Sequence, residues 1–175
     1  SLDYAGPQVG EGSKGVLLGV GEPRRSLPSE FSGNPQKPVS AVRVFTDGCL
    51  VVEGPSYAED AGAGATIAKD PAFADWPLVV LVDNAEQAAR STTNFLWTTF
   101  TRFNPASDIY AHSVELLHNH ASFTEPIVID SRMKTGYPEE LFCDDATHAL
   151  VAQRWKEYFP GGGVEMGDSA SGHLD

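Results

Sequence analysis

The chain has 175 residues, of which 41% are hydrophobic, so it is long enough to form one packed domain. It carries 24 acidic and 12 basic residues, and the resulting net charge of −12 repels phosphate backbones and anionic membrane surfaces. No apolar run approaches the roughly 20 residues that span a bilayer. The first residues lack the charged and apolar segments of a signal peptide. We therefore expect a cytoplasmic protein that binds neither nucleic acid nor membranes.

Short apolar segments predict the strands of a sheet. They lie at residues 14–20, 39–45, 49–52, 78–82 and 127–129. The segments Leu78–Val82 and Ile127–Ile129 are apolar on both faces, as in parallel strands that are covered by helices. Three prolines predict an irregular connection at residues 24–38. Small residues predict a loop at 53–74, with one helical turn near 71–75.

Three segments have helical features. Residues 84–89 predict a short helix or turn. The segment Ser91–Phe103 has apolar residues at helical spacing and a possible cap at Thr92 or Thr93, although its β-branched threonines favour a strand. We expect a helix that runs into a strand or extended turn at residues 102–108, where Pro105 stops the helix. The segment Ala146–Phe159 is the clearest helix, with a cap at Asp145 or Thr147.

Strands that alternate with helices predict a single α/β domain with a mostly parallel or mixed sheet flanked by helices. We place this domain at residues 14–160. Residues 1–13 and the glycine-rich residues 161–175 predict a flexible N-terminus and a flexible tail.

Two aspartates, Asp83 and Asp130, follow the two most apolar strands. Ligands of open α/β sheets gather at the carboxyl ends of strands, so these carboxylates are candidate binding groups. The alternative is that they cap helices or bond to loops.

Basic residues are few in this chain, and three of them lie near those aspartates in the sequence. Arg102 either pairs with a carboxylate such as Asp108 or contacts an anionic substrate group, and Arg132 and Lys134 are further candidates.

Metal and thiol chemistry receive weaker support. His118 and His120 would face one side of a strand, but the HxH pattern alone predicts no metal site. Cys49 and Cys143 form no CxxC pair, and we interpret both as reduced, partly buried thiols.

Three motifs, in order, resemble the C-terminal domain of the UbiD family of (de)carboxylases. They are LVVLVDN at 78–84, WTTFTRFNPASD at 97–108 and IDSRMK at 129–134, and the likeness covers residues 76–159. The resemblance implies CO2 addition to or removal from an aromatic or unsaturated acid, with prenylated FMN as the cofactor. The stretch EGPSYAE at 53–59 is similar to the family's acidic motif but is one residue too long, so we assign it no catalytic role.

The family's flavin domain has no counterpart in this sequence. The resemblance therefore implies a small subunit in a hetero-oligomer, where a larger catalytic chain holds the prenylated FMN together with a divalent metal and a monovalent cation. In the family the C-terminal domain closes over the substrate, and the matching positions here are Thr99, Phe100, Thr101 and Arg102.

Two other functional classes stay open. The chain could be a scaffold or binding protein that keeps the fold without flavin chemistry, because fold does not fix function. It could also be a metal-dependent hydrolase built on Asp83, Asp130 and the histidines.

Overall fold

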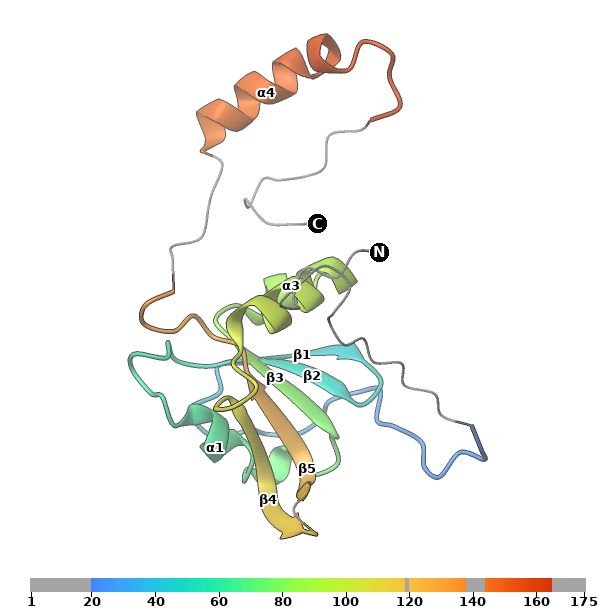
Figure 1. Cartoon of the computed structure of the whole chain (residues 1–175), viewed down its shortest axis with the longest axis vertical. Coiled ribbons are helices and arrows are strands. Elements are labelled where there is room, and N and C mark those ends of the chain that lie inside the picture. The colour runs from blue at the N-terminus through green and yellow to red at the C-terminus, as the bar shows by residue number, and fades with distance from the viewer. Residues whose placement is uncertain (1–19, 119, 138–143, 165–175) are drawn as a thin grey trace.

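The computed structural model describes residues 20–118, 120–137 and 144–164. The predicted strand at 14–20 lies almost wholly outside this part of the chain, as do the flexible N-terminus and most of the tail. The centre of the fold is a five-stranded sheet in the order β1-β2-β3-β5-β4 (Figure 1). The strands are β1 (Ala41–Thr46), β2 (Cys49–Glu53), β3 (Leu78–Val82), β4 (Ile109–Leu117) and β5 (His120–Asp130).

The sheet is mixed. Its middle strands β2, β3 and β5 are parallel, with Cys49 opposite Leu78 and Leu78 opposite Ile127. The edge strands β1 and β4 are antiparallel to their neighbours. This arrangement confirms the predicted α/β class, and it brings the carboxyl ends of β3 and β5 to the same edge of the sheet.

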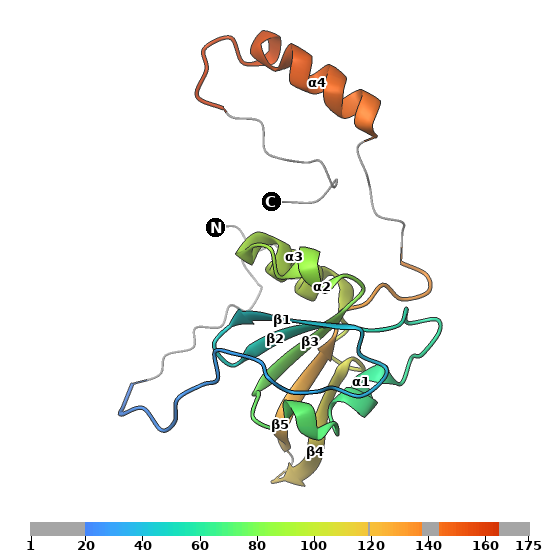
Figure 2. The ribbon, with the colours of Figure 1, turned by 180° about the vertical axis from the view of Figure 1, so that it is seen from behind.

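Helices cover both faces of the sheet, as the doubly apolar strands predict. One face packs against α1 (Ala63–Ile67) and the short 3₁₀ helix η1 (Pro71–Phe73), and the other packs against α2 (Ala85–Ala88) and α3 (Thr92–Arg102) (Figures 1 and 2). Alternate residues of β2 and β3 point to opposite faces. The first core is made of Leu50, Val52, Val79, Leu81, Ile67, Phe73 and Trp76, and the second of Val51, Val80, Val82, Ala85, Ala88 and Phe95.

Polar side chains begin the helices. The Asn84 side chain accepts a hydrogen bond from the Gln87 amide, and the Ser91 side chain accepts one from the Asn94 amide. Ser91, and not Thr92 or Thr93, is therefore the cap of α3. The predicted last helix is present as α4 (Asp145–Tyr158), and its cap is Asp144, one residue before the predicted positions.

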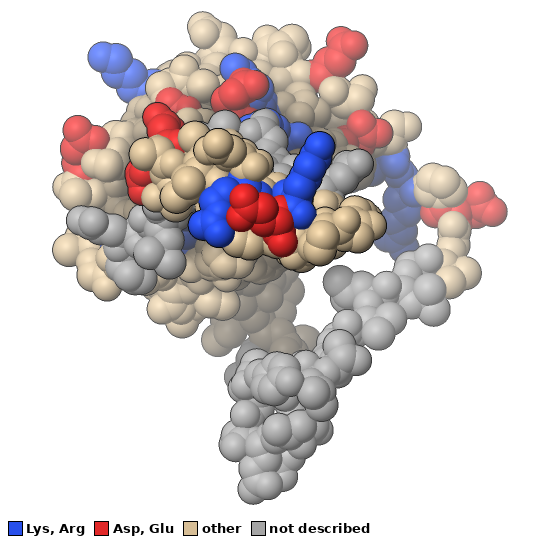
Figure 3. All heavy atoms as spheres, turned by 90° about the horizontal axis from the view of Figure 1, so that it is seen from above, with Lys and Arg blue, Asp and Glu red and all other residues tan. Residues whose placement is uncertain are grey.

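Helix α4 lies away from the sheet in both ribbon views (Figures 1 and 2) and contains no buried residue. Acidic and basic side chains are interspersed over the face seen from above (Figure 3). Within the described residues, no helix has both the length and the apolar character to cross a membrane.

The structure contains two elements that the sequence did not predict, α1 and β4, and one strand, β5, that is longer than predicted. Helix α1 forms within the expected loop, where Gly64 allows the helix to approach the ring of Tyr110: a Cβ atom at Gly64 would lie 2.5 Å from that ring. Strand β4 is absent from the prediction. Strand β5 begins seven residues before the predicted segment at 127–129, because β4 and β5 form one long hairpin.

Candidate functional site

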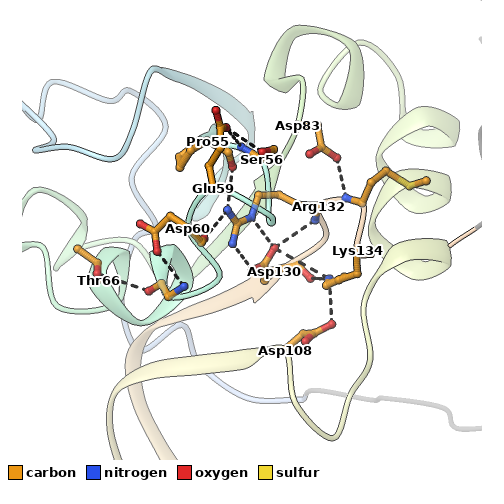
Figure 4. Close-up of polar contacts among 12 residues, drawn as sticks. Pro55, Ser56, Glu59, Asp60, Thr66, Asp83, Asp108, Asp130, Arg132 and Lys134 are labelled. Atoms are coloured by element: carbon orange, nitrogen blue, oxygen red, sulfur yellow. Dashed lines mark hydrogen bonds and ion pairs between the residues drawn. The ribbon is translucent and has the colours of Figure 1, made fainter. Parts of the chain in front are cut away.

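Charged side chains meet at the carboxyl ends of β3 and β5 (Figure 4). Asp83 follows β3, Asp130 is the last residue of β5, and Arg132 and Lys134 lie in the segment after β5. Asp108 joins them from the turn between α3 and β4. The parallel strands therefore bring together the two aspartates and the cations that the sequence singled out.

The centre of this cluster is an ion pair between Asp130 and Arg132, whose side chains are both completely buried. The guanidinium donates from Nε to Oδ1 at 2.9 Å and from Nη2 to Oδ2 at 2.6 Å, which is the bidentate geometry that arginine favours. Burial lowers the pKa of Arg132, but the hydrogen bonds and charge of Asp130 outweigh it and hold that pKa above its usual value. Arg132 is therefore a fixed, buried cation.

The remaining donors of Arg132 hold the segment that follows β2. Its Nη1 donates to the carbonyl oxygens of Pro55 at 2.8 Å and Asp60 at 2.9 Å. The guanidinium also lies 5.3 Å from the centre of the Tyr57 ring, within the range of a cation–π contact. Arg132 thus fastens the loop between β2 and α1 to the edge of the sheet.

Lys134 fastens the end of α3 to the same edge of the sheet. Its Nζ donates to the carbonyl oxygen of Arg102 at 2.9 Å and to that of Asp130 at 2.5 Å, and it pairs with Asp108 Oδ2 at 2.9 Å. Burial raises the pKa of Asp108, but hydrogen bonds from the Asn104 amide, Lys134 and Ser107 outweigh it and lower the pKa overall.

Arg102 pairs with a carboxylate, which is one of the two alternatives that the sequence left open, and that carboxylate is Asp83. Arg102 Nη1 lies 3.3 Å from Asp83 Oδ2, and the same oxygen accepts a hydrogen bond from the Met133 amide at 2.8 Å. The ion pair with Asp108 is formed by Lys134. Burial lowers the pKa of Arg102, and the charge of Asp83 opposes that change only in part. With 31% of its side chain exposed, Asp83 is the part of the cluster nearest to solvent.

The four candidates on α3 divide between its two faces. Thr99 and Arg102 are buried against the sheet, and the Ser131 hydroxyl donates to the Thr99 carbonyl oxygen at 3.2 Å. Phe100 is 62% exposed, and Thr101 is exposed with its hydroxyl bonded to the Trp97 carbonyl oxygen. Only Phe100 and Thr101 can therefore contact a partner or a substrate without a rearrangement.

Two further exposed side chains lie beside Phe100, and sequence reasoning did not select them. Leu96 is 47% and Trp97 is 51% exposed, so Leu96, Trp97 and Phe100 form an apolar surface that we name the α3 outer face. Helical spacing was the available signal, because Leu96, Phe100 and Phe103 recur at positions that lie on one side of a helix. In the structure Phe95 is the aromatic residue that packs on the sheet, where it stacks on Phe45.

The two glutamates of the stretch at 53–59 accept hydrogen bonds within the chain, and His118 and His120 do not lie together on one strand face. Glu53 accepts hydrogen bonds from the Ala85 amide and the Ser40 hydroxyl, and Glu59 accepts from the Ser56 amide and hydroxyl. His118 has a φ of 49° at the hairpin turn, so it does not share a strand face with His120 as expected. Among the described residues, no group of three His, Cys, Asp or Glu side chains is placed to hold a metal ion.

Cys49 is a free, buried thiol, as predicted, and Cys143 lies outside the described residues. Burial raises the pKa of Cys49 to about 11. A thiol with this pKa is protonated at neutral pH and is a poor nucleophile.

No protein-family model matches the chain. A protein of Chlamydia trachomatis serovar D is 42% identical to it over 160 residues. A Chlamydia pneumoniae protein, named as one of the subunits of 4-hydroxybenzoate decarboxylase, is 38% identical over 160 residues. Each match covers 91% of this chain and 27% of the relative, so the chain spans about a quarter of the length of these curated relatives.

Among solved structures, vanillic acid decarboxylase of Sedimentibacter hydroxybenzoicus in its open form superposes with a TM-score of 0.43. The sequence identity is 15%, and the superposition covers 71% of this chain and 30% of that chain.

Proposed function

We propose that this chain supplies the α/β domain of a UbiD-type decarboxylase or carboxylase that acts on an aromatic acid such as 4-hydroxybenzoate. The observation that carries the proposal is the 38% identity, over 91% of the chain, to the Chlamydia pneumoniae protein named for 4-hydroxybenzoate decarboxylase. The motifs at 78–84, 97–108 and 129–134, found from the sequence alone, support the same family independently.

In this proposal the α3 outer face forms one wall of the substrate cleft. Leu96, Trp97 and Phe100 offer an apolar and aromatic surface that would pack on the ring of an aromatic acid and exclude water from it. The Phe103 ring meets Phe100 edge-on at 6.0 Å, which limits the motion of the Phe100 side chain. The other wall comes from a larger catalytic chain.

The buried cluster positions that wall. Lys134 and Ser131 bond to the last turns of α3 through the carbonyl oxygens of Arg102 and Thr99. Arg102 then anchors the same turn to Asp83 at the end of β3. We therefore assign Arg102, Arg132 and Lys134 to positioning of the cleft wall and not to contact with the substrate.

Prenylated FMN would be held mainly by the larger chain. The residues described here do not suit a flavin phosphate, because Arg132 and Lys134 already bind aspartates and carbonyl oxygens. Any divalent metal and monovalent cation that accompany the flavin would lie there too. Within the described residues we accordingly name no catalytic residue.

The test compares this chain alone with the assembly that an affinity tag on the chain captures from its native cells. Each sample receives 4-hydroxybenzoate with a labelled carboxyl group, and the release of labelled CO2 is measured. We expect release by the assembly, a flavin absorbance in it, and no release by the chain alone even with added prenylated FMN. A colourless, inactive assembly would favour the scaffold alternative, and turnover by the chain alone that Glu53→Gln abolishes would refute the division of roles.

A further inference from the structure

The hairpin of β4 and β5 extends beyond the rest of the sheet. Strand β3 pairs only with residues 127–130 of β5, whereas β4 and β5 continue together to the pair of Leu117 with His120. We name residues 112–117 and 120–125 the β-arm, which projects from the sheet as a two-stranded ribbon (Figures 1 and 2). A ribbon of two strands is only marginally stable in water by itself, so its apolar side chains need a second layer.

One face of the β-arm is apolar. Val114 lies opposite Phe123 on this ribbon. Leu116 lies opposite Ala121, and the period of two places all four side chains on the same face. The residues that the structure describes leave this face open, because Val114 is 56%, Leu116 is 74% and Phe123 is 41% exposed.

An ion pair brings the N-terminal part of the chain to this face. Glu125 follows Phe123 by two residues, so its side chain leaves β5 on the same side as the apolar residues. Arg25 Nη2 donates to Glu125 Oε1 at 2.6 Å. Three residues further on, the Pro28 carbonyl oxygen accepts a hydrogen bond from the Gly48 amide at 2.8 Å. The chain therefore crosses from the turn between β1 and β2 to the β-arm.

The segment that precedes Arg25 is long enough to cover the β-arm. The sequence predicts a strand at residues 14–20, KGVLLGV, and Val20 is 89% exposed. The chain bends at residues 21 and 22, where Gly21 has a φ of 150° that glycine readily adopts. Five residues span at most about 18 Å when extended, which is close to the length of the β-arm. The bend therefore allows residues 14–20 to return along the β-arm instead of passing beyond its tip.

Composition and charge favour this segment over a second copy of the chain. Residues 14–20 contain four large apolar side chains and no acidic one. Residues 14–25 hold three basic residues and one acidic residue, in a chain whose net charge is −12. The segment is therefore attracted to the rest of the molecule, whereas two whole chains repel each other.

We propose that residues 14–20 form the second layer over the apolar face of the β-arm of the same chain, with the ion pair of Arg25 and Glu125 as the anchor. The anchor lies only a few residues from the segment, so the effective concentration of the segment at the β-arm is high and does not depend on protein concentration. The β-arm extends from the amino end of β5, opposite to the candidate site at the carboxyl ends. The contact is accordingly independent of the proposed decarboxylase function.

The accessibility of a thiol on the β-arm tests the contact. Leu116→Cys is made in the full chain together with Cys143→Ser, and iodoacetamide labelling of position 116 is followed by peptide mass mapping. The matched control is Leu150→Cys on α4, where the leucine is 53% exposed. We expect position 116 to be labelled at least about tenfold more slowly than position 150, because reaction requires the segment to leave the face. Buried Cys49 should stay unlabelled in every variant, which shows that the core remains folded.

Two sets of substitutions identify what covers the face. Val16→Asp with Leu18→Asp should raise the labelling rate at position 116 to that at position 150. Arg25→Gln should raise it by at most about fivefold, because an exposed ion pair contributes little, and Arg24→Gln should leave it unchanged.

Three results would overturn the proposal. Equal labelling of positions 116 and 150 in the chain with its natural N-terminal segment would show that the face is open. Slow labelling that survives the double aspartate variant would show that residues 14–20 do not cover it. Protection that increases with protein concentration would assign the cover to a second copy. Equal rates in the two arginine variants would refute the anchor.

Discussion

Replacement of Arg132 by methionine tests whether the buried cluster holds the sheet edge together. The substitution leaves Asp130 completely buried without its bidentate partner, and it removes the donors to the carbonyl oxygens of Pro55 and Asp60. Loss of one partner from a buried ion pair typically costs about 3–5 kcal/mol. In a domain of this size each kcal/mol lowers the melting temperature by about 2–4 °C, so we expect a fall of roughly 6–20 °C.

The assay is urea and thermal unfolding followed by circular dichroism, with Arg43→Met as the control. Arg43 pairs with Glu86 at 2.7 Å, but both side chains are exposed, so its loss should cost no more than about 1 kcal/mol. Equal destabilisation by the two variants would refute the reasoning. Restored stability in a double variant Asp130→Asn with Arg132→Met would support it, because the uncompensated charge would be gone.

Three further predictions concern single groups. Asp108 has a lowered pKa when folded, so its stabilisation is present above its unfolded value of about 3.9 and is lost as pH falls through the folded value; Asp108→Asn should flatten the acid limb of urea-unfolding stability, and an unchanged limb would contradict this. The Cys49 thiol, with a pKa of about 11, should react with iodoacetamide at pH 8 only after unfolding, and rapid labelling of the native chain would count against its burial. Gly64→Ala should cost about 1–3 kcal/mol through its clash with Tyr110, and a stability equal to that of Gly161→Ala, where nothing lies within 4 Å, would show that the helix shifts freely.

The centre of the sheet could be predicted from the sequence because its strands are buried on both faces. Leu78–Val82 is apolar throughout, and the aspartates after β3 and at the end of β5 followed from it. The outer part of the β4–β5 hairpin could not be predicted in the same way, because residues 112–117 and 120–124 are exposed and their pairing depends on contacts across the hairpin. Ala111 and Ser113 also mark a register shift that interrupts the alternation.

The sequence predicted which residues belong to the candidate site but not which of them form ion pairs with each other. Arg102, Asp108 and Lys134 were all selected, yet the sequence could not show that Lys134 would reach Asp108 and leave Arg102 to Asp83. Helix α3 has apolar residues on both faces, with Phe95 on one and Phe100 on the other. Periodicity alone does not say which face meets the sheet, so the exposed position of Trp97 could not be found.

The central claim is that the α3 outer face forms a wall of the substrate cleft, and the kinetics of Phe100→Ala in the captured assembly test it most directly. The control is Tyr158→Ala on α4, an aromatic side chain that is 47% exposed outside α3. We expect Phe100→Ala to leave the composition of the assembly and its melting temperature unchanged and to lower kcat/KM for 4-hydroxybenzoate at least about tenfold, which corresponds to about 1.4 kcal/mol of lost contact. The Tyr158→Ala assembly should keep the wild-type value. Equal kcat/KM in the Phe100→Ala and wild-type assemblies would contradict the claim.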